Sequence, residues 1–111
     1  MAFLNLTPHA VNLVDTDSVV IMTIPPSGTV ARATQSDVHV GEIEGVEVVK
    51  TTFGEPIDLP APQEGVWLVV SLATASAAQA SGRTTSDLLL TSGPVRDTDG
   101  RIIGCRRFAR L

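Results

Sequence analysis

The chain has 111 residues and a formal net charge of −4, with 43% apolar and 18% charged residues. This length predicts one domain, residues 1–111, with one ordinary core. The acidic balance excludes general nucleic-acid binding, which needs a basic face that neutralises phosphates, and no apolar run approaches the roughly 18 residues of a transmembrane helix. The low charged fraction favours a homo-oligomer, because a large apolar surface usually marks an interface; a compact monomer is the alternative.

The first two thirds of the chain have the pattern of a β protein: short runs rich in Val, Ile and Thr are separated by Gly, Pro and Asp clusters that predict turns. Glu44-Gly45 predicts a tight hairpin turn, because Gly can adopt a positive φ. Segment 54–65 carries three prolines and predicts an extended surface crossing. The candidate strands are 3–6, 10–14, 19–24, 29–33, 38–43, 46–53 and 66–71.

The only convincing helix covers 72–80, which is rich in alanine. Ser71 is placed to cap its start, and Gly82 stands where a left-handed residue ends many helices. A final hairpin turns at Asp99-Gly100. Together these elements predict an α+β fold: a twisted antiparallel sheet or a small barrel-like β domain with one short Ala-rich helix.

Catalytic and metal motifs are weak throughout the chain. His9, His39 and Cys105 lie singly, without the paired spacing of zinc sites, so we expect no metal and no cofactor. Asp97-Thr98-Asp99-Gly100 lacks the later ligands of a calcium loop and predicts a turn. Ser71 with His9 as base lacks the Gly-x-Ser-x-Gly elbow, so capping is favoured for Ser71.

The location of the protein is inferred from two further features. The single Cys105 cannot form an internal disulfide, and the first residues lack the charged region and apolar stretch of a signal peptide. We therefore expect a cytoplasmic protein.

Charge polarity gives the best hint of function. Residues 1–65 hold nine carboxylates against two cations, whereas six of the eight basic residues are arginines in the last 29 positions. Three of them, Arg83, Arg96 and Arg101, predict either Arg–Asp pairs that pin the final hairpin to the body, with Asp87 and Asp97 as partners, or guanidiniums that hold phosphate; the structural alternative is favoured. The start of the helix offers free N–H groups to an anion. The candidate ligand contacts are His9, Arg32, Ser71, Thr74, Arg83 and Arg96.

Four groups of residues give the chain a family resemblance. These groups are 4–11, 25–28 with 31–32, 52–55, and 95–97 with 100–105. In this order, and over nearly the full length, the chain resembles small uncharacterised proteins of bacteriophages and prophages of Gram-positive bacteria. The resemblance brings no catalytic residues with it. It implies a context in which many small phage proteins counter host defence, and one class forms homo-oligomers that trap immune signals derived from cyclic nucleotides or ADP-ribose.

The combined expectation is a noncatalytic, oligomeric phage protein that sequesters a small anionic, nucleotide-derived signal such as a cyclic nucleotide or an ADP-ribose derivative. Two alternatives stay open. One is a small enzyme acting on a nucleotide or related phosphate compound, with His9, Asp87 or Asp97 transferring a proton. The other is a protein-binding or virion-associated module.

Overall fold

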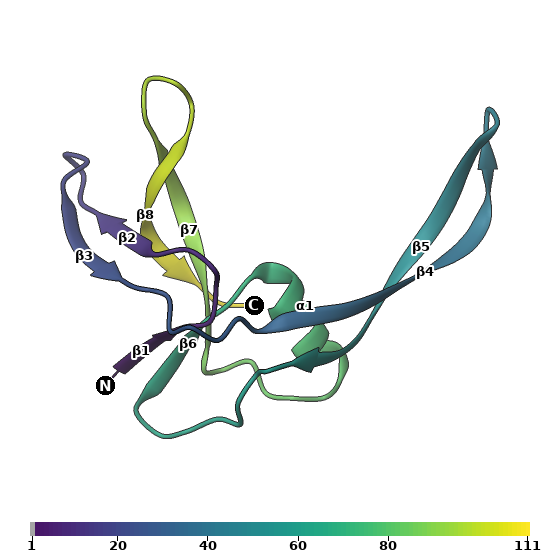
Figure 1. The fold of residues 1–111 in the computed structure, drawn as a ribbon, viewed down its shortest axis with the longest axis horizontal. Coiled ribbons are helices and arrows are strands. Elements are labelled where there is room, and N and C mark those ends of the chain that lie inside the picture. The colour runs from purple at the N-terminus through teal and green to yellow at the C-terminus, as the bar shows by residue number, and fades with distance from the viewer. Residues whose placement is uncertain (1) are drawn as a thin grey trace.

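A computed structural model describes residues 2–111 and contains a mixed β-sheet, one short helix and a long projecting hairpin (Figure 1). The predicted α+β class is therefore confirmed. No helix in the described part of the chain is long and apolar enough to cross a membrane. The elements are β1 (Ala2–Asn5), β2 (Val11–Val14), β3 (Val20–Ile24), β4 (Arg32–Ile43), β5 (Val46–Ile57), β6 (Val66–Val69), α1 (Leu72–Ala80), β7 (Leu88–Arg96) and β8 (Ile102–Ala109).

The larger sheet has the strand order β1-β6-β7-β8-β2-β3. Its hairpins β2–β3 and β7–β8 are antiparallel, as expected, but β1–β6, β6–β7 and β2–β8 pair in parallel. The parallel pairing of β6 with β7 has a local cause: α1 returns the chain to the starting edge of the sheet, so both strands run the same way. The antiparallel expectation thus describes the hairpins and not the whole sheet.

The helix covers 72–80 as predicted, and both of its ends have identifiable caps. The Oγ of Ser71 accepts a hydrogen bond from the Thr74 N–H at 3.2 Å. At the other end Gly82 has a φ of 88°, and the following N–H of Arg83 donates to the Ala78 carbonyl at 3.0 Å. The small Ala75 and Ala78 are fully buried, so the helix approaches the sheet closely.

Two clusters of buried side chains form the core of the body. The first lies between α1 and the sheet and contains Leu6, Ala31, Leu68, Val70, Ala75, Ala78 and Leu88. The second brings together four buried residues from β2, β3, β6 and β8: Val11, Ile24, Val69 and Cys105. Both clusters draw on the 66–71 run, in which Leu68, Val69 and Val70 are buried as the continuous apolar sequence predicts, whereas Val66 and Trp67 are half-buried and Ser71 is exposed.

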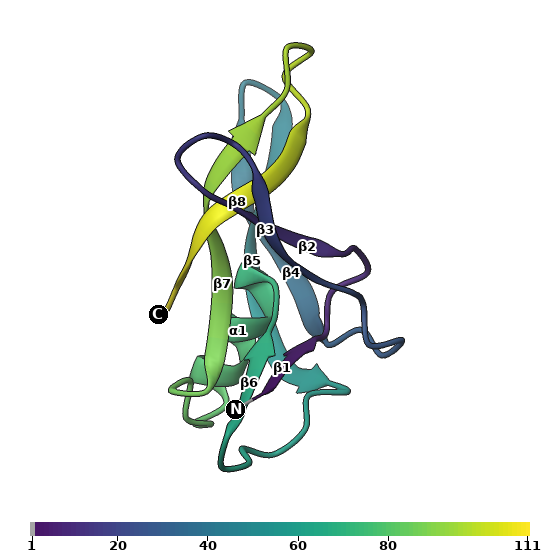
Figure 2. The same ribbon diagram turned by 90° about the vertical axis from the view of Figure 1, so that its left-hand side faces the viewer.

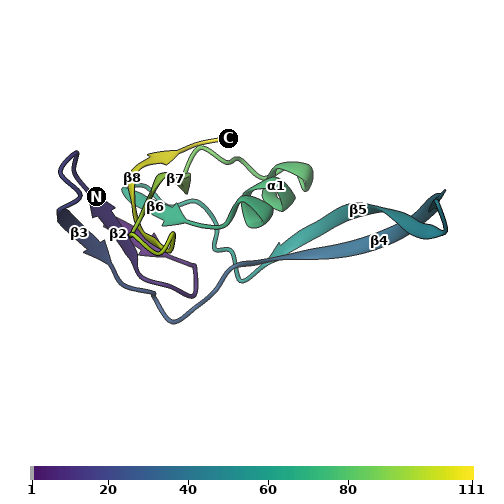
Figure 3. The same ribbon diagram turned by 90° about the horizontal axis from the view of Figure 1, so that it is seen from above.

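Strands β4 and β5 form an extended hairpin, residues 32–57, which we call the arm. Figures 1 and 3 show it projecting away from the body beside α1. Its turn at Glu44 (φ 51°) and Gly45 (φ 81°) is the predicted two-residue connection. The arm takes in residues 54–57 as strand, so the predicted surface crossing is shorter and begins at Asp58.

The hairpin β7–β8 is also found where it was predicted. The Oδ1 of Asp97 accepts hydrogen bonds from the N–H groups of Asp99 and Arg101, at 2.9 and 3.0 Å. The Asp97 carboxylate therefore helps to form the turn, in agreement with the prediction of a turn at 97–100. Figure 2 shows the hairpin extending beyond the other strands of the sheet.

Candidate functional site

One cavity of the body has a volume of about 470 Å³, and we call it the His9 cavity. It lies where three segments far apart in the sequence meet: the turn before β2, the start of α1 and strand β8. Its wall is mainly apolar, with hydroxyl, amide and imidazole groups interspersed. The lining residues are Thr7, His9, Ala10, Val11, Asn12, Val70, Ser71, Thr91, Ile102, Ile103, Gly104 and Cys105.

The turn that carries His9 is fixed by the buried side chain of Asn5. Asn5 Nδ2 donates to the carbonyls of His9 at 2.8 Å and Ile24 at 3.1 Å, and its Oδ1 accepts from the Thr7 N–H and Oγ1 at 3.0 and 2.6 Å. Asn5 is only 1% exposed, so these bonds form in a region of low polarity where they are stronger than in water. His9 thereby sits on a rigid backbone with its side chain exposed at the cavity.

A second hollow of about 450 Å³ adjoins the first, and we call it the Arg32 hollow. Both cavities are lined by Thr7 and Ser71, so Ser71 at the start of α1 stands between His9 and Arg32. The N–H groups at the start of a helix carry partial positive charge, although that of Thr74 is already bound by the Ser71 cap. The lining of the two cavities includes no carboxylate. This arrangement is suited to an anion.

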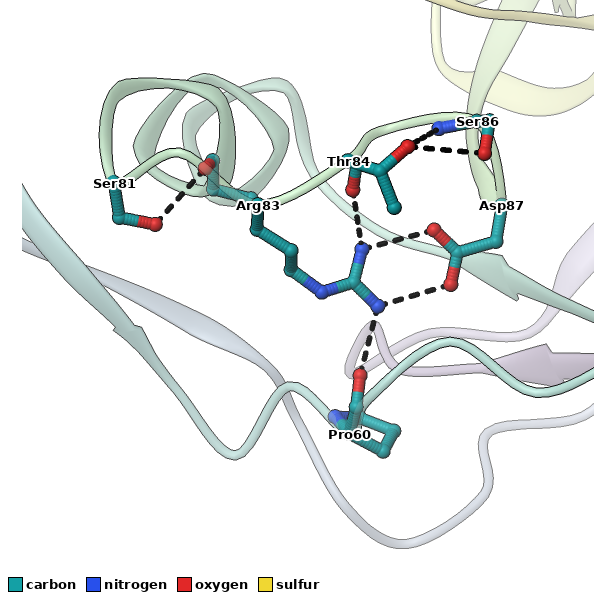
Figure 4. Close-up of polar contacts among 7 residues, drawn as sticks. Pro60, Ser81, Arg83, Thr84, Ser86 and Asp87 are labelled. Atoms are coloured by element: carbon teal, nitrogen blue, oxygen red, sulfur yellow. Dashed lines mark hydrogen bonds and ion pairs between the residues drawn. The ribbon is translucent and has the colours of Figure 1, made fainter.

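Arg83 lies outside the lining of both cavities and has a structural role; Figure 4 shows its polar contacts. Its guanidinium binds both carboxylate oxygens of Asp87, at 2.8 and 2.9 Å, and donates to the carbonyls of Pro60 and Thr84 at 2.8 and 2.7 Å. The two side chains are only 15% and 10% exposed. This pair confirms the structural alternative for Arg83, since all these contacts tie the crossing segment and the post-helix loop to β7.

Thr74 and Arg96 also lie outside the lining of both cavities. Thr74 is fully buried, and its Oγ1 donates to the Ala31 carbonyl at 3.1 Å. Arg96 donates to the Gly100 carbonyl at 2.9 Å, so it supports the turn of its own hairpin and forms no pair with Asp97. Of the six candidate contacts, His9, Arg32 and Ser71 line the two adjoining cavities. Thr74 lines neither, but its hydroxyl accepts a hydrogen bond from Ser71 Oγ at 3.0 Å. Arg83 and Arg96 lie elsewhere.

Four lining residues with a polar or thiol side chain were not among the predicted contacts: Thr7, Asn12, Thr91 and Cys105. Asn12 is the one polar residue inside the apolar run of β2, a signal that could have been used. The Asn12 Nδ2 donates to the Ile103 carbonyl at 3.3 Å, and its Oδ1 accepts from the Thr23 hydroxyl at 2.8 Å. Burial raises the pKa of the Cys105 thiol, against the opposing effect of backbone hydrogen bonds from Ser92 and Arg107.

Among residues 2–111, no three His, Cys, Asp or Glu side chains lie close enough together to hold a metal ion. His39 is exposed on the arm, with its Nδ1 3.1 Å from Glu47 Oε2. Comparisons with protein-family models, curated proteins and solved structures found no match to this chain.

Proposed function

We propose that this protein is a noncatalytic binding protein that sequesters a small anionic, nucleotide-derived molecule in the His9 cavity and the adjoining Arg32 hollow. One observation carries the proposal: two hollows free of carboxylates share Ser71 at a helix start, with His9 on one side and Arg32 on the other. Their volumes of about 470 and 450 Å³ lie within the range of small-molecule sites.

The apolar and the polar parts of the wall suit different parts of such a ligand. The apolar side chains of Val11, Val70 and Ile102 suit the face of a nucleobase, whereas Arg32 and the helix start suit a phosphate. Retention needs only donors, positive charge and a shaped apolar wall. Asp87 and Asp97, the carboxylates considered for proton transfer, serve the Arg83 pair and a turn instead, which favours binding over catalysis.

The resemblance to phage and prophage proteins sets the order in which ligands should be tested. Immune signals of the bacterial host cytoplasm, which include cyclic nucleotides and ADP-ribose derivatives, come first. The direct test is thermal unfolding of the protein with cyclic AMP, a cyclic dinucleotide, ADP-ribose and cyclic ADP-ribose in turn, followed by calorimetric titration of any compound that stabilises it. A ligand at a hundred times its Kd should stabilise the protein by about 2.7 kcal/mol.

Two variants locate the site on the protein. Arg32→Ala and His9→Ala should each weaken binding about 10- to 100-fold, the scale of a lost hydrogen bond to a charged group, while Arg110→Ala serves as an exposed control. Chromatography of the incubated ligand should recover it unchanged. Recovery of a product would favour the enzyme alternative. Stabilisation by none of the four compounds, or equal affinity in all three variants, would contradict the proposal.

A protein-binding or virion-associated module is the second candidate, and the arm is the observation in its favour. None of the arm's residues is buried against the body, although many are apolar. Exposed apolar surface of this kind marks protein interfaces.

A further inference from the structure

The arm exposes apolar side chains along its whole length. An isolated two-stranded hairpin is marginally stable in water and needs a third strand, a helix or another surface against one of its faces. Here α1 contacts only part of the arm, and the remainder projects beyond it (Figure 3). The large exposed apolar residues of the arm are Val38, Val40, Ile43, Val46, Val49, Phe53 and Ile57.

The arm is also strongly acidic near its tip. Residues 32–57 contain five carboxylates and two cations, a net charge of −3. Glu42 and Glu47 stand directly opposite each other in the register, and Glu44 occupies the turn between them. Like charges directly opposite each other destabilise a strand pair unless a cation lies nearby. The tip therefore favours a partner surface that is both apolar and basic.

The opposite end of the same molecule has such a surface. Residues 88–111 of the β7–β8 region carry five arginines and two aspartates, a net charge of +3, and the adjoining β2–β3 hairpin adds the carboxylates Asp15 and Asp17. Within the described part of the chain, the side chains of Arg101 and Arg107 bind no acceptor. The same end of the sheet exposes apolar residues: Ile102 next to Arg101 is 61% exposed, and Ile21 on the edge strand β3 is 67% exposed.

We infer that the arm docks on the β3–β2–β8 end of a second copy of this chain, forming a twofold dimer in which each copy clasps the other. Figure 1 shows the arm and the β7–β8 hairpin at opposite ends of the molecule, so each copy offers both surfaces at once. A twofold axis pairs each acidic tip with an arginine-rich hairpin and closes the assembly. Ile102 and Ile103 also line the His9 cavity, so the docked arm lies beside that site. The inference is independent of the proposed ligand.

Charge reversal provides the test. The arm variant is Glu42→Lys/Glu44→Lys, the hairpin variant is Arg101→Glu/Arg107→Glu, and Glu64→Lys, an exposed carboxylate outside the arm, is the control. Light scattering should give the parent and the control about twice the 11.7 kDa of one chain. Each variant alone should be a monomer, because its arm and its hairpin then carry like charges.

An equimolar mixture of the two variants should restore the dimer. In the mixed pair the lysine-bearing arm meets the glutamate-bearing hairpin, and the parental arm meets the parental hairpin, so both contacts are attractive again. Circular dichroism checks that each variant is folded before its mass is measured by light scattering. A monomeric parent at sub-millimolar concentration, dimeric single variants, or a mixture that stays monomeric would each overturn the inference.

Discussion

The arginines of this chain differ in role although they share one chemistry. Arg83 is bound by a carboxylate and two carbonyls in a mostly buried position, Arg96 and Arg106 each bind a turn carbonyl, and Arg32 lines a hollow. A guanidinium has five donors in a fixed fork, so the acceptors within reach decide what it does. A count of arginines near the C-terminus indicates a basic surface but does not identify a site.

Replacing Arg83 by Ala should destabilise the protein by about 1.5–3 kcal/mol, because Asp87 would remain 10% exposed with no cation beside it. Urea unfolding followed by circular dichroism measures the change. Arg83→Ala/Asp87→Ala should recover part of the loss, since no buried charge is then left unpaired. Arg110→Ala, at an exposed position, should stay within about 0.5 kcal/mol of the parent. Equal stability of Arg83→Ala and the parent would refute the structural role of the pair.

Cys105 should react slowly with iodoacetamide at neutral pH. Burial raises the pKa of its thiol above the usual 9.0, and only the thiolate is nucleophilic. The reaction should therefore accelerate as the pH rises beyond the ordinary pKa of a thiol, and mass spectrometry follows the modified fraction. Because Cys105 lines the His9 cavity, a ligand bound there should slow the reaction further. A rate equal to that of the urea-unfolded chain would contradict this.

The elements of the fold depend on one another to different degrees. The helix is short and is held by its caps and by two buried alanines against the sheet, whereas the arm is held by its own strand pairing. The Thr74 hydroxyl links them, because its acceptor Ala31 immediately precedes β4. The root of the arm is thus attached to the core, while the tip is not.

Thr74→Val should cost about 1–3 kcal/mol, because the isosteric side chain leaves the buried Ala31 carbonyl without its donor. Thr16→Val is a matched control at an exposed turn position. Thermal unfolding of both variants against the parent measures the difference. A Thr74→Val protein as stable as Thr16→Val would mean that another group satisfies the Ala31 carbonyl.

Hydrogen exchange should distinguish the arm from the body. Amides of 36–52 should exchange about tenfold or more faster than those of β6 in the arm variant defined above, since the arm contributes no buried side chain and can open locally. In the parent, protection of the same arm amides should rise with protein concentration if a second copy covers them. Peptide-level mass spectrometry reads both segments in one experiment. Arm amides as slow as those of β6 at high dilution would contradict local opening.

At the scale of the whole molecule, the structure separates a packed body from a projecting arm. The molecule measures 48 × 39 × 23 Å, and neither core cluster contains an arm residue. Both candidate cavities belong to the body and the root of the arm. Arg32 at the root of the arm, and Ile102 and Ile103 on the proposed docking surface, also line these cavities, so only the tip of the arm can be changed without touching the candidate ligand site.

A chain in which Asn-Gly replaces residues 36–52 should still fold, because Gln35 and Phe53 already face each other in the register and no core residue is removed. Cooperative thermal unfolding and a sheet-rich circular dichroism spectrum would establish the body as an independent unit. This variant should also be monomeric, because it lacks the arm tip that docks on the second copy in the proposed dimer. A shortened chain that aggregates or unfolds without cooperativity would show that the arm is needed for folding.

The sequence by itself determined the local features: the helix over 72–80, its Ser71 cap, and the turns at Glu44-Gly45 and Asp99-Gly100. These depend on residues close together in the chain, whose conformational preferences act directly on the backbone. Only the tertiary structure decided the parallel pairings, the projection of the arm, and the separation of Arg83 and Arg96 from His9 and Arg32. Period-two patterns predict strands but not their neighbours, and a side chain's role depends on acceptors supplied by segments distant in sequence, as Pro60 is for Arg83.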